Sequence, residues 1–260
     1  MGGWIVAEYP NFNSVIFTDE IEVEENLQKQ QGLTVHFNGL YFDLYQATVL
    51  KMDFEPIVES FGEKGFHAKY FFKKKSDANY LLMRTLTDLI IKHNLLWLNF
   101  SFSRRSLCDK RLKPFFDMEF SNMKFQKGNY KAVGFYFYLH AINYYQEKFD
   151  VFRPKIRIYT DKDQYLKINQ AFFHEGAVLK NIELIIASRG SSEPFLYLSD
   201  LVGFIFRRVK TYLGQDFRKM DHVQVATTDI LTKECLTNLL KINRAGLFKY
   251  LDLWEIMPTE

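Results

Sequence analysis

The sequence predicts an α/β protein with a mixed β-sheet covered by helices. Segments rich in β-branched and aromatic residues come first along the chain, and strand-like and helix-like segments alternate after them. A long helix-like segment that begins at Pro194 follows the last strand-like segment. Strands first and alternation afterwards are typical of a mixed sheet with helices packed on it.

Six segments are expected to be strands of one sheet: residues 14–18, 33–37, 40–50, 95–102, 155–160 and 182–187. Asn38-Gly39 separates two of them and predicts a hairpin, because Asn-Gly favours the tight turns that join antiparallel strands. Residues 19–25 hold five carboxylates in seven positions. This acidic stretch is interpreted either as a solvated loop or as an edge that faces a metal ion.

Five segments are expected to be helical: residues 76–93, 131–149, 164–174, 194–213 and 227–242. Ser76 has the side chain of a helix cap, and apolar residues recur at helical spacing after it. Residues 104–131 are basic and irregular, and they contain Pro114 and Gly128. Because long structureless loops are uncommon in compact domains, this stretch is interpreted as a functional insertion or a lid.

Composition favours a globular protein of the cytoplasm. The chain of 260 residues can bury a substantial core, and its 17% of aromatic residues indicates a phenylalanine-rich core rather than base-stacking surfaces. Cys108 and Cys235 are too few for a disulfide framework. The sequence contains neither a signal segment nor an apolar run of about 20 residues. We therefore expect a reduced, cytoplasmic protein with no membrane contact.

Charge is distributed unevenly along the chain. Residues 1–61 carry a net charge of −8, whereas residues 62–131 carry +9. The two regions could complement each other within the fold, or the basic region could form a surface that binds phosphates. The pattern alone leaves both interpretations open.

A specific motif lies in residues 182–209, which read as a strand, a serine-rich turn and a helix that carries Leu-x-Leu-x-Asp-Leu-x-x-Gly. This arrangement resembles a prokaryotic family known as domain of unknown function thirty-eight hundred. Its members begin with an Asp-Glu-Ser-Gly strand end and finish on a Leu-Gln-x-Ala-Asp-Leu-x-x-Gly helix. The resemblance implies an RNase H-like domain over residues 1–213, with a basic insertion at 104–131 and a C-terminal helical extension at 214–260. It also implies nuclease activity.

The resemblance extends, more weakly, over residues 14–213. The matching motifs are Thr18-Asp19-Glu20, His67-Ala68-Lys69, Tyr159-Thr160-Asp161 and Leu198-Ser199-Asp200. Ile21 and Glu22 stand where the family has Ser-Gly, so the first motif is degenerate. Glu8 is a rival for its acidic position. Ser199 and Tyr197 replace the usual Ala and Gln of the last motif.

The resemblance implies a two-metal carboxylate site. Asp19, Asp161 and Asp200 would be catalytic residues and ligands of Mg²⁺ or Mn²⁺, with Glu20 as a further ligand candidate. Lys69 would orient a water molecule or the scissile phosphate, although a solvated lysine explains it nearly as well. His67 could assist.

Each aspartate also has a structural explanation. Asp19 could be a loop carboxylate, and Asp161 could be the N-cap of the following helix. Asp200 could pair with Arg207 or with a nearby lysine. Gly203 is unfavourable within a helix, so we expect it to allow a close approach between helix and sheet.

The preferred function is a metal-dependent nuclease that acts on RNA or DNA. The residues expected to bind nucleic-acid phosphates are Lys73, Lys74, Lys75, Arg104, Arg105, Lys110 and Arg111. Two alternatives are a degenerate RNase H-like module that binds nucleic acid or a partner protein without cleavage, and a subunit of a larger complex for prokaryotic defence. The sequence contains no phosphate-binding loop, nucleophile elbow or His-Glu-x-x-His motif.

Overall fold

The chain builds one six-stranded mixed sheet with the strand order β5-β4-β1-β2-β3-β6. The computed structural model describes residues 14–27, 30–62, 65–112, 130–149, 156–161, 182–187, 193–213 and 229–256. The strands are β1 (Ser14–Leu27), β2 (Gln30–Asp43), β3 (Leu96–Ser103), β4 (Ile156–Asp161), β5 (Ile182–Ala187) and β6 (Phe248–Leu251). The prediction of an α/β fold with a mixed sheet flanked by helices is confirmed.

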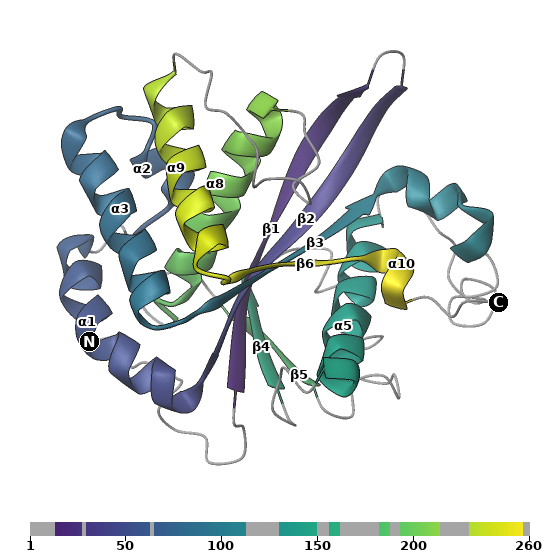
Figure 1. Cartoon of the computed structure of the whole chain (residues 1–260), viewed down its shortest axis with the longest axis horizontal. Helices are drawn as coiled ribbons and strands as arrows, with labels where there is room; N and C mark the ends of the chain where they lie inside the picture. Colours follow the sequence, from purple (N-terminus) through teal and green to yellow (C-terminus); the bar gives the residue numbers. More distant parts are fainter. Residues whose placement is uncertain are drawn as a thin grey trace.

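Strands β1, β2 and β3 are antiparallel neighbours, whereas β4 and β5 run parallel to β1. Strand β6 adds to the outer edge of β3 in parallel orientation. Strands β1 and β2 are the longest, and in Figure 1 one end of this pair extends beyond the helices. The expected strands at 155–160 and 182–187 therefore lie in the same sheet as the N-terminal strands.

The hairpin predicted at Asn38-Gly39 was wrong. These two residues lie in the middle of β2, and Gly39 pairs with Thr18 of β1. A Cβ atom at Gly39 would overlap the hydroxyl group of Tyr138 and lie 2.8 Å from Cγ2 of Ile16. The glycine is therefore explained by a side chain that packs against the strand and not by a turn.

The expected strand at 40–50 was also wrong beyond Asp43, because a helix starts there. Asp43 and Gln46 form a capping box: the backbone N–H of Gln46 donates to Asp43 Oδ1 at 2.7 Å, and the backbone N–H of Asp43 donates to Gln46 Oε1 at 2.8 Å. This pair satisfies backbone groups at the helix start, so the β-rich composition of the segment is overridden.

The acidic stretch 19–25 is part of β1 and not a loop. Its residues pair in register with β2, from Asp19 opposite Asn38 to Glu25 opposite Gly32. Because side chains alternate along a strand, Ile21 and Val23 are buried while Glu22 between them is only half-buried.

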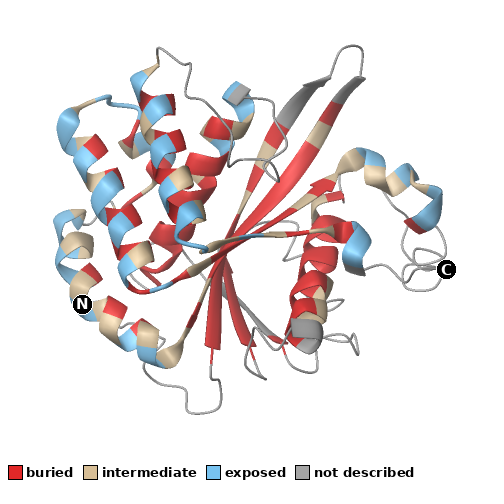
Figure 2. Cartoon of the chain, viewed as in Figure 1, coloured by how far each residue is buried: buried red, intermediate tan, exposed pale blue. Residues whose placement is uncertain are grey.

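Helices cover both faces of the sheet. They are α1 (Leu44–Ser60), α2 (Ala68–Phe71), α3 (Asp77–Lys92), α5 (Tyr130–Phe149), α8 (Leu196–Leu213), α9 (Ile230–Arg244) and α10 (Leu253–Ile256). Helices α1, α2, α3, α8 and α9 lie on one side, and α5 and α10 lie on the other (Figure 1). Figure 2 shows that burial is concentrated in the strands and on the helix faces toward them.

Aromatic side chains fill both resulting cores, as predicted from composition. On the α8 side, the ring of Phe17 stacks on that of Tyr159 at 4.7 Å between centroids, and Phe195 packs beside them. On the α5 side, Phe37 stacks on Tyr138 at 5.4 Å. Apolar residues thus occupy both faces of the central strands.

Several expected helices are confirmed. Ser76 caps α3, where its hydroxyl accepts from the backbone N–H of Asn79 at 3.3 Å. Helices α5, α8 and α9 match the segments expected at 131–149, 194–213 and 227–242. The helix expected at 164–174 lies outside the described residues.

The structure adds detail to two expected regions. In the basic stretch 104–131, residues 104–108 and 110–112 form short 3-10 turns, and residues 113–129 lie outside the described part. The segment 214–260, expected to be a helical extension, contains α9 but also contributes β6 to the sheet. None of the helices in the described residues is long and apolar enough to span a membrane.

Gly39→Ala tests the close packing of α5 against β2. We expect the free energy of unfolding to fall by about 1–3 kcal/mol, since the new methyl group overlaps the buried Tyr138 hydroxyl. Gly32→Ala in the same strand is the control. Its Cβ would lie 3.4 Å from Nε of the exposed Arg105, so a change within about 0.5 kcal/mol is expected. Urea unfolding curves measure both, and equal losses would contradict the packing argument.

Candidate functional site

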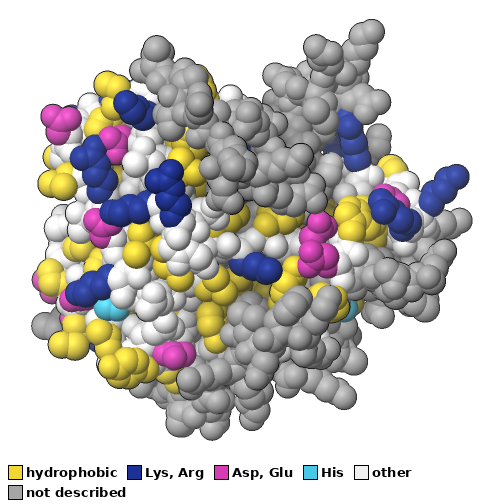
Figure 3. All heavy atoms as spheres, viewed as in Figure 1, with side chains coloured by type: hydrophobic (Ala, Val, Ile, Leu, Met, Phe, Trp, Pro, Cys, Tyr) yellow, Lys and Arg dark blue, Asp and Glu magenta, His cyan; other side chains and the backbone are white. Residues whose placement is uncertain are grey.

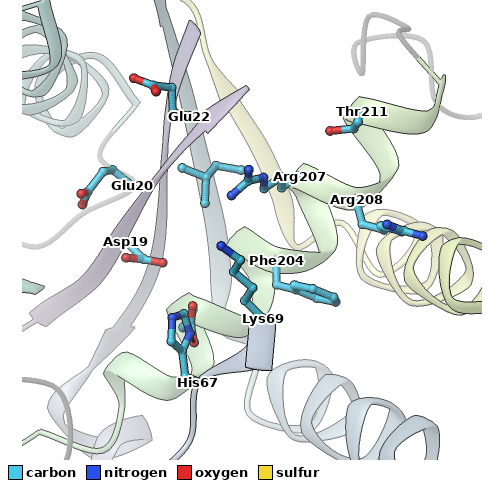
Figure 4. Close-up of a pocket in the computed structure, with 11 residues that line it drawn as sticks. Asp19, Glu20, Glu22, His67, Lys69, Phe204, Arg207, Arg208 and Thr211 are labelled. Carbon is cyan, nitrogen blue, oxygen red and sulfur yellow. Dashed lines mark hydrogen bonds and ion pairs between the residues drawn. The ribbon is translucent and has the colours of Figure 1, made fainter. Parts of the chain in front are cut away.

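A pocket of about 530 Å³ opens between β1, α2 and α8 (Figure 4). Its lining comes from three distant parts of the chain: Asp19, Glu20, Ile21, Glu22, His67, Lys69, Asp200, Phe204, Arg207, Arg208 and Thr211. Three of the four motif segments of the sequence therefore meet in one place.

Asp19 is buried in this pocket, with 4% of its surface exposed. Alternation along β1 places its side chain on the same face as Phe17, which packs in the core on the α8 side. A Cβ atom at Gly203 of α8 would lie 3.6 Å from Asp19 Oδ2 and 3.4 Å from Ile21 Cγ2. Gly203 thus lies against β1, but these are ordinary van der Waals distances, so the predicted need of a glycine for close approach stays a prediction.

Asp200 lies on α8, three residues before Gly203, and is 5% exposed. Its Oδ2 atom accepts the backbone N–H of Ala68 at 2.7 Å and lies 2.9 Å from Nδ1 of His67. In the described part of the chain, this atom contacts the first residue of α2 and the residue before it, and no ion pair joins Asp200 to Arg207 or Lys69 there. These contacts anchor α2 to α8.

His67 connects Asp200 to the mouth of the pocket. Its side chain is 38% exposed, and its ring meets the ring of Tyr70 edge-on at 4.7 Å between centroids. When Nδ1 of the neutral ring carries the proton and donates a hydrogen bond to Asp200, Nε2 is a hydrogen-bond acceptor. The sequence indicated His67 only as an assisting residue, and the structure places it in contact with the buried carboxylate.

Two cations contribute to the pocket wall. In Figure 4, Lys69 reaches from α2 and Arg207 reaches from α8 toward β1. Among the described residues, neither of them forms an ion pair within 4.0 Å. Arg208 differs, because its guanidinium donates to Asp229 at 2.7 Å and to Thr232 at 3.1 Å. Lys69 and Arg207 are thus the cations of this wall that are not already committed to an ion pair in the described part of the chain.

His36 does not add to the positive charge near this face of the sheet. It is 2% exposed on β2, its Nδ1 lies 2.6 Å from Ser101 Oγ, and its ring packs against Phe206 of α8. Burial, with a smaller contribution from Lys210, lowers the pKa of His36 to about 3. The ring is therefore neutral at physiological pH.

Glu20 does not share a face with Asp19. In Figure 4 the two carboxylates point away from each other, as expected for neighbours in a strand. Glu22, on the same strand face as Glu20, accepts the hydroxyl of Tyr130 and lies 3.5 Å from Nζ of Lys131 on α5. The geometry therefore does not favour the predicted joint ligation of one ion by Asp19 and Glu20.

Asp161 is the last residue of β4, at the strand end predicted for it. The preceding residue, Thr160, pairs with Thr18, which directly precedes Asp19. The side chain of Asp161 lies outside the described part of the chain.

A metal ion can be assessed against the two described aspartates. In the part of the chain that the structure describes, no three His, Cys, Asp or Glu residues gather into a metal site. Asp19 and Asp200 supply carboxylate oxygens, the ligand type that Mg²⁺ and Mn²⁺ prefer. These two side chains thus offer the donor type that such an ion prefers, and Asp161 is the residue predicted to complete the set.

Sequence reasoning missed a polar group beneath the pocket. Trp97 Nε1 and Asn99 Nδ2 donate to Asn38 Oδ1 at 3.1 and 2.9 Å. Asn38 Nδ2 is buried without a hydrogen-bond partner among the described residues, and a Cβ at Gly203 would lie 3.9 Å from it. Asn38 is the register partner of Asp19, so both side chains approach the same point of α8. Isolated asparagines in otherwise apolar strands were the signal that could have revealed this group.

The seven predicted phosphate-binding residues lie outside the lining of this pocket. Lys73, Lys74 and Lys75 are exposed after α2, Arg105 and Lys110 are exposed in the 3-10 turns, and Arg104 is half-buried. Figure 3 shows basic side chains scattered among acidic and apolar ones on the face in view.

Arg111 and Lys75 each have a partner within the chain. Arg111 pairs with Asp109 at 2.8 Å, and its guanidinium carbon lies 3.5 Å from the ring centre of Trp254. Lys75 pairs with Asp229 at 2.7 Å. Their charges are therefore already used in contacts within the chain.

No protein-family model, curated protein or solved structure matches this chain. The resemblance to an RNase H-like family thus depends on its motifs alone. Independently of any relative, the fold brings Asp19, Asp200 and the segment 67–69 together around one pocket.

Asp229→Asn tests the charge cluster behind the pocket. Hydrogen bonds from Lys75, Thr232 and Arg208 hold the pKa of Asp229 well below its usual range. Its carboxylate therefore stabilises the fold above a pH of about 4, and this contribution is lost as the pH falls further. Asparagine remains a good N-cap, so the substitution removes mainly the charge.

We expect Asp229→Asn to lower the free energy of unfolding by about 1 kcal/mol at neutral pH, since its cationic partners are half exposed. Urea unfolding at pH 7 and at pH 3 measures the difference between variant and parent. A difference that stays constant between the two pH values would show that the charge is not responsible.

Proposed function

We propose that this chain is a metal-dependent nuclease that cleaves phosphodiester bonds in RNA or DNA. One observation carries the proposal: the buried carboxylates of Asp19 and Asp200 share a pocket with the cations Lys69 and Arg207. Carboxylates suit divalent cations, and cations without an ion pair among the described residues suit the phosphates of a substrate.

The finer assignment of the fold is RNase H-like. Such a fold requires the later parallel strands to lie in the same sheet as the N-terminal antiparallel strands. Strands β4 and β5 lie beside β1 in that sheet, and α8 packs on its face. Both features support the assignment.

Asp19, Asp200 and Asp161 are the residues that would hold Mg²⁺ or Mn²⁺. When bound, such an ion would polarise the phosphodiester and lower the pKa of a bound water. Lys69 and Arg207 would hold the non-bridging oxygens of the phosphate. Asp200 would keep the His67 ring in one orientation, with Nε2 available to accept a proton from a water in the pocket.

A second candidate function is a module that binds nucleic acid, or a partner protein in a larger complex, without cleavage. A specific observation favours it: Asp200 Oδ2 already accepts the backbone N–H of Ala68 and contacts Nδ1 of His67 at the start of α2. The departure from Ser-Gly after the first motif favours it too.

Asp200→Asn separates the two candidates. We expect the variant to lose Mg²⁺- or Mn²⁺-dependent cleavage, because the amide no longer attracts the cation. The fold should survive with a change within about 1 kcal/mol, since the amide oxygen can still accept the Ala68 N–H. Cleavage of labelled single- and double-stranded RNA and DNA, with thermal unfolding in parallel, measures both effects.

Asp88→Asn is the matched control, because Asp88 lies on α3 in an exposed pair with Lys241. It should leave cleavage unchanged. A parent protein that cleaves none of the substrates, together with a markedly earlier melting of Asp200→Asn, would replace the nuclease proposal by the binding module.

The double substitution Lys69→Ala and Arg207→Ala tests phosphate binding at the pocket. We expect weaker binding to nucleic acid and a slope of log K against log salt that is smaller by about one to two, because two phosphate contacts are removed. Lys241→Ala, on α9 outside the pocket, should leave the slope unchanged. An unchanged slope in the double variant would assign nucleic-acid binding to another surface.

A further inference from the structure

We infer that the ligand of this pocket is single-stranded nucleic acid, and that Tyr70 is a platform on which one unpaired base stacks. The inference rests on the proposed function for the chemical class of the ligand. It goes further by naming the strandedness and a residue that recognises it.

Tyr70 is the exposed member of an otherwise buried aromatic segment. Phe66 and Phe72 are 2% and 0% exposed and pack in the core on the α8 side, whereas Tyr70 is 68% exposed. A single exposed aromatic residue is ordinary on a protein surface. Its surroundings distinguish this one.

The position of Tyr70 is tied to the pocket. Its ring contacts the ring of His67 edge-on, with an angle of 88° between the planes, and His67 contacts the buried Asp200. Nζ of the neighbouring Lys69 lies 6.0 Å from the Tyr70 ring centre. An aromatic surface thus stands beside a cation of the pocket wall, which combines the two features that proteins use to bind single strands.

The depth of the acidic groups favours an unpaired strand. Asp19 and Asp200 are about 5% exposed or less, so a phosphate that reaches them must leave the protein surface and enter the pocket. In a duplex each base is paired and stacked on its neighbours, and no base face is free beside the entering phosphate. A flexible single strand can place a phosphate against Lys69 and an adjacent base against Tyr70.

The test is a binding measurement in EDTA, so that cleavage does not occur. Fluorescence anisotropy is recorded with labelled oligothymidylate and with a duplex of equal length, for the parent, Tyr70→Ala, Tyr70→Phe and Tyr45→Ala. Tyr45 is 78% exposed on α1 and is the matched surface tyrosine.

For the single strand, we expect Tyr70→Ala to raise the Kd by about 5- to 100-fold, because stacking on an aromatic side chain contributes that much per base. Tyr70→Phe keeps the ring and should stay within about 2-fold of the parent, as should Tyr45→Ala. The duplex should bind more weakly, and Tyr70→Ala should not change its Kd.

An unchanged Kd of Tyr70→Ala for the single strand, or equal losses on both probes, would overturn the inference. The nuclease proposal fails separately. A parent that binds single strands through Tyr70 but cleaves nothing with Mg²⁺ or Mn²⁺ keeps this inference and loses the catalytic one. A parent that cleaves nucleic acid with Mg²⁺ or Mn²⁺, but whose binding does not depend on Tyr70, keeps the nuclease proposal and loses this inference.

Discussion

The packing of α8 against β1 is the constraint on which the candidate site depends. At Gly203 a Cβ atom would lie 3.4 Å from Ile21 and 3.6 Å from the Asp19 carboxylate, so helix and strand meet here in ordinary van der Waals contact. This packing lets Asp200 share a pocket with Asp19 and turns Arg207 toward β1. The same helix packs against the aromatic core beneath it, so the site and the core depend on one contact.

Two carboxylates in one buried pocket need compensation, because a charge removed from water is costly unless it has partners. The Ala68 N–H and His67 provide part of this compensation for Asp200, and the same contacts hold α2 against α8. A divalent cation bound at the pocket, as proposed, would add to this compensation. The buried amide of Asn38 approaches the same part of α8, next to the residues that line the pocket.

Much of the secondary structure followed from local pattern. The helix that begins after Ser76 follows from its cap and its apolar periodicity, whereas the aromatic helix α5 and the strand Ile182–Ala187 follow from the composition of their own residues. Errors arose where a distant contact overrode local preference. Asn38-Gly39 has the composition of a turn, yet it lies in mid-strand because Tyr138 packs against Gly39. The acidic residues after Thr18 favour a loop, yet pairing with β2 keeps them extended.

For the site, the sequence by itself singled out the candidate residues: Asp19, Lys69 and Asp200 from their motifs, and Gly203 from its unfavourable place in a helix. Only the tertiary structure decided which of them meet. It turned the Glu20 carboxylate away from that of Asp19, brought Arg207 and Tyr70 to the pocket region, and left the predicted basic stretches outside the lining. The physical reason is that spacing along the chain specifies the face of one strand or helix, whereas the register of the sheet and the packing of α8 specify which faces come together.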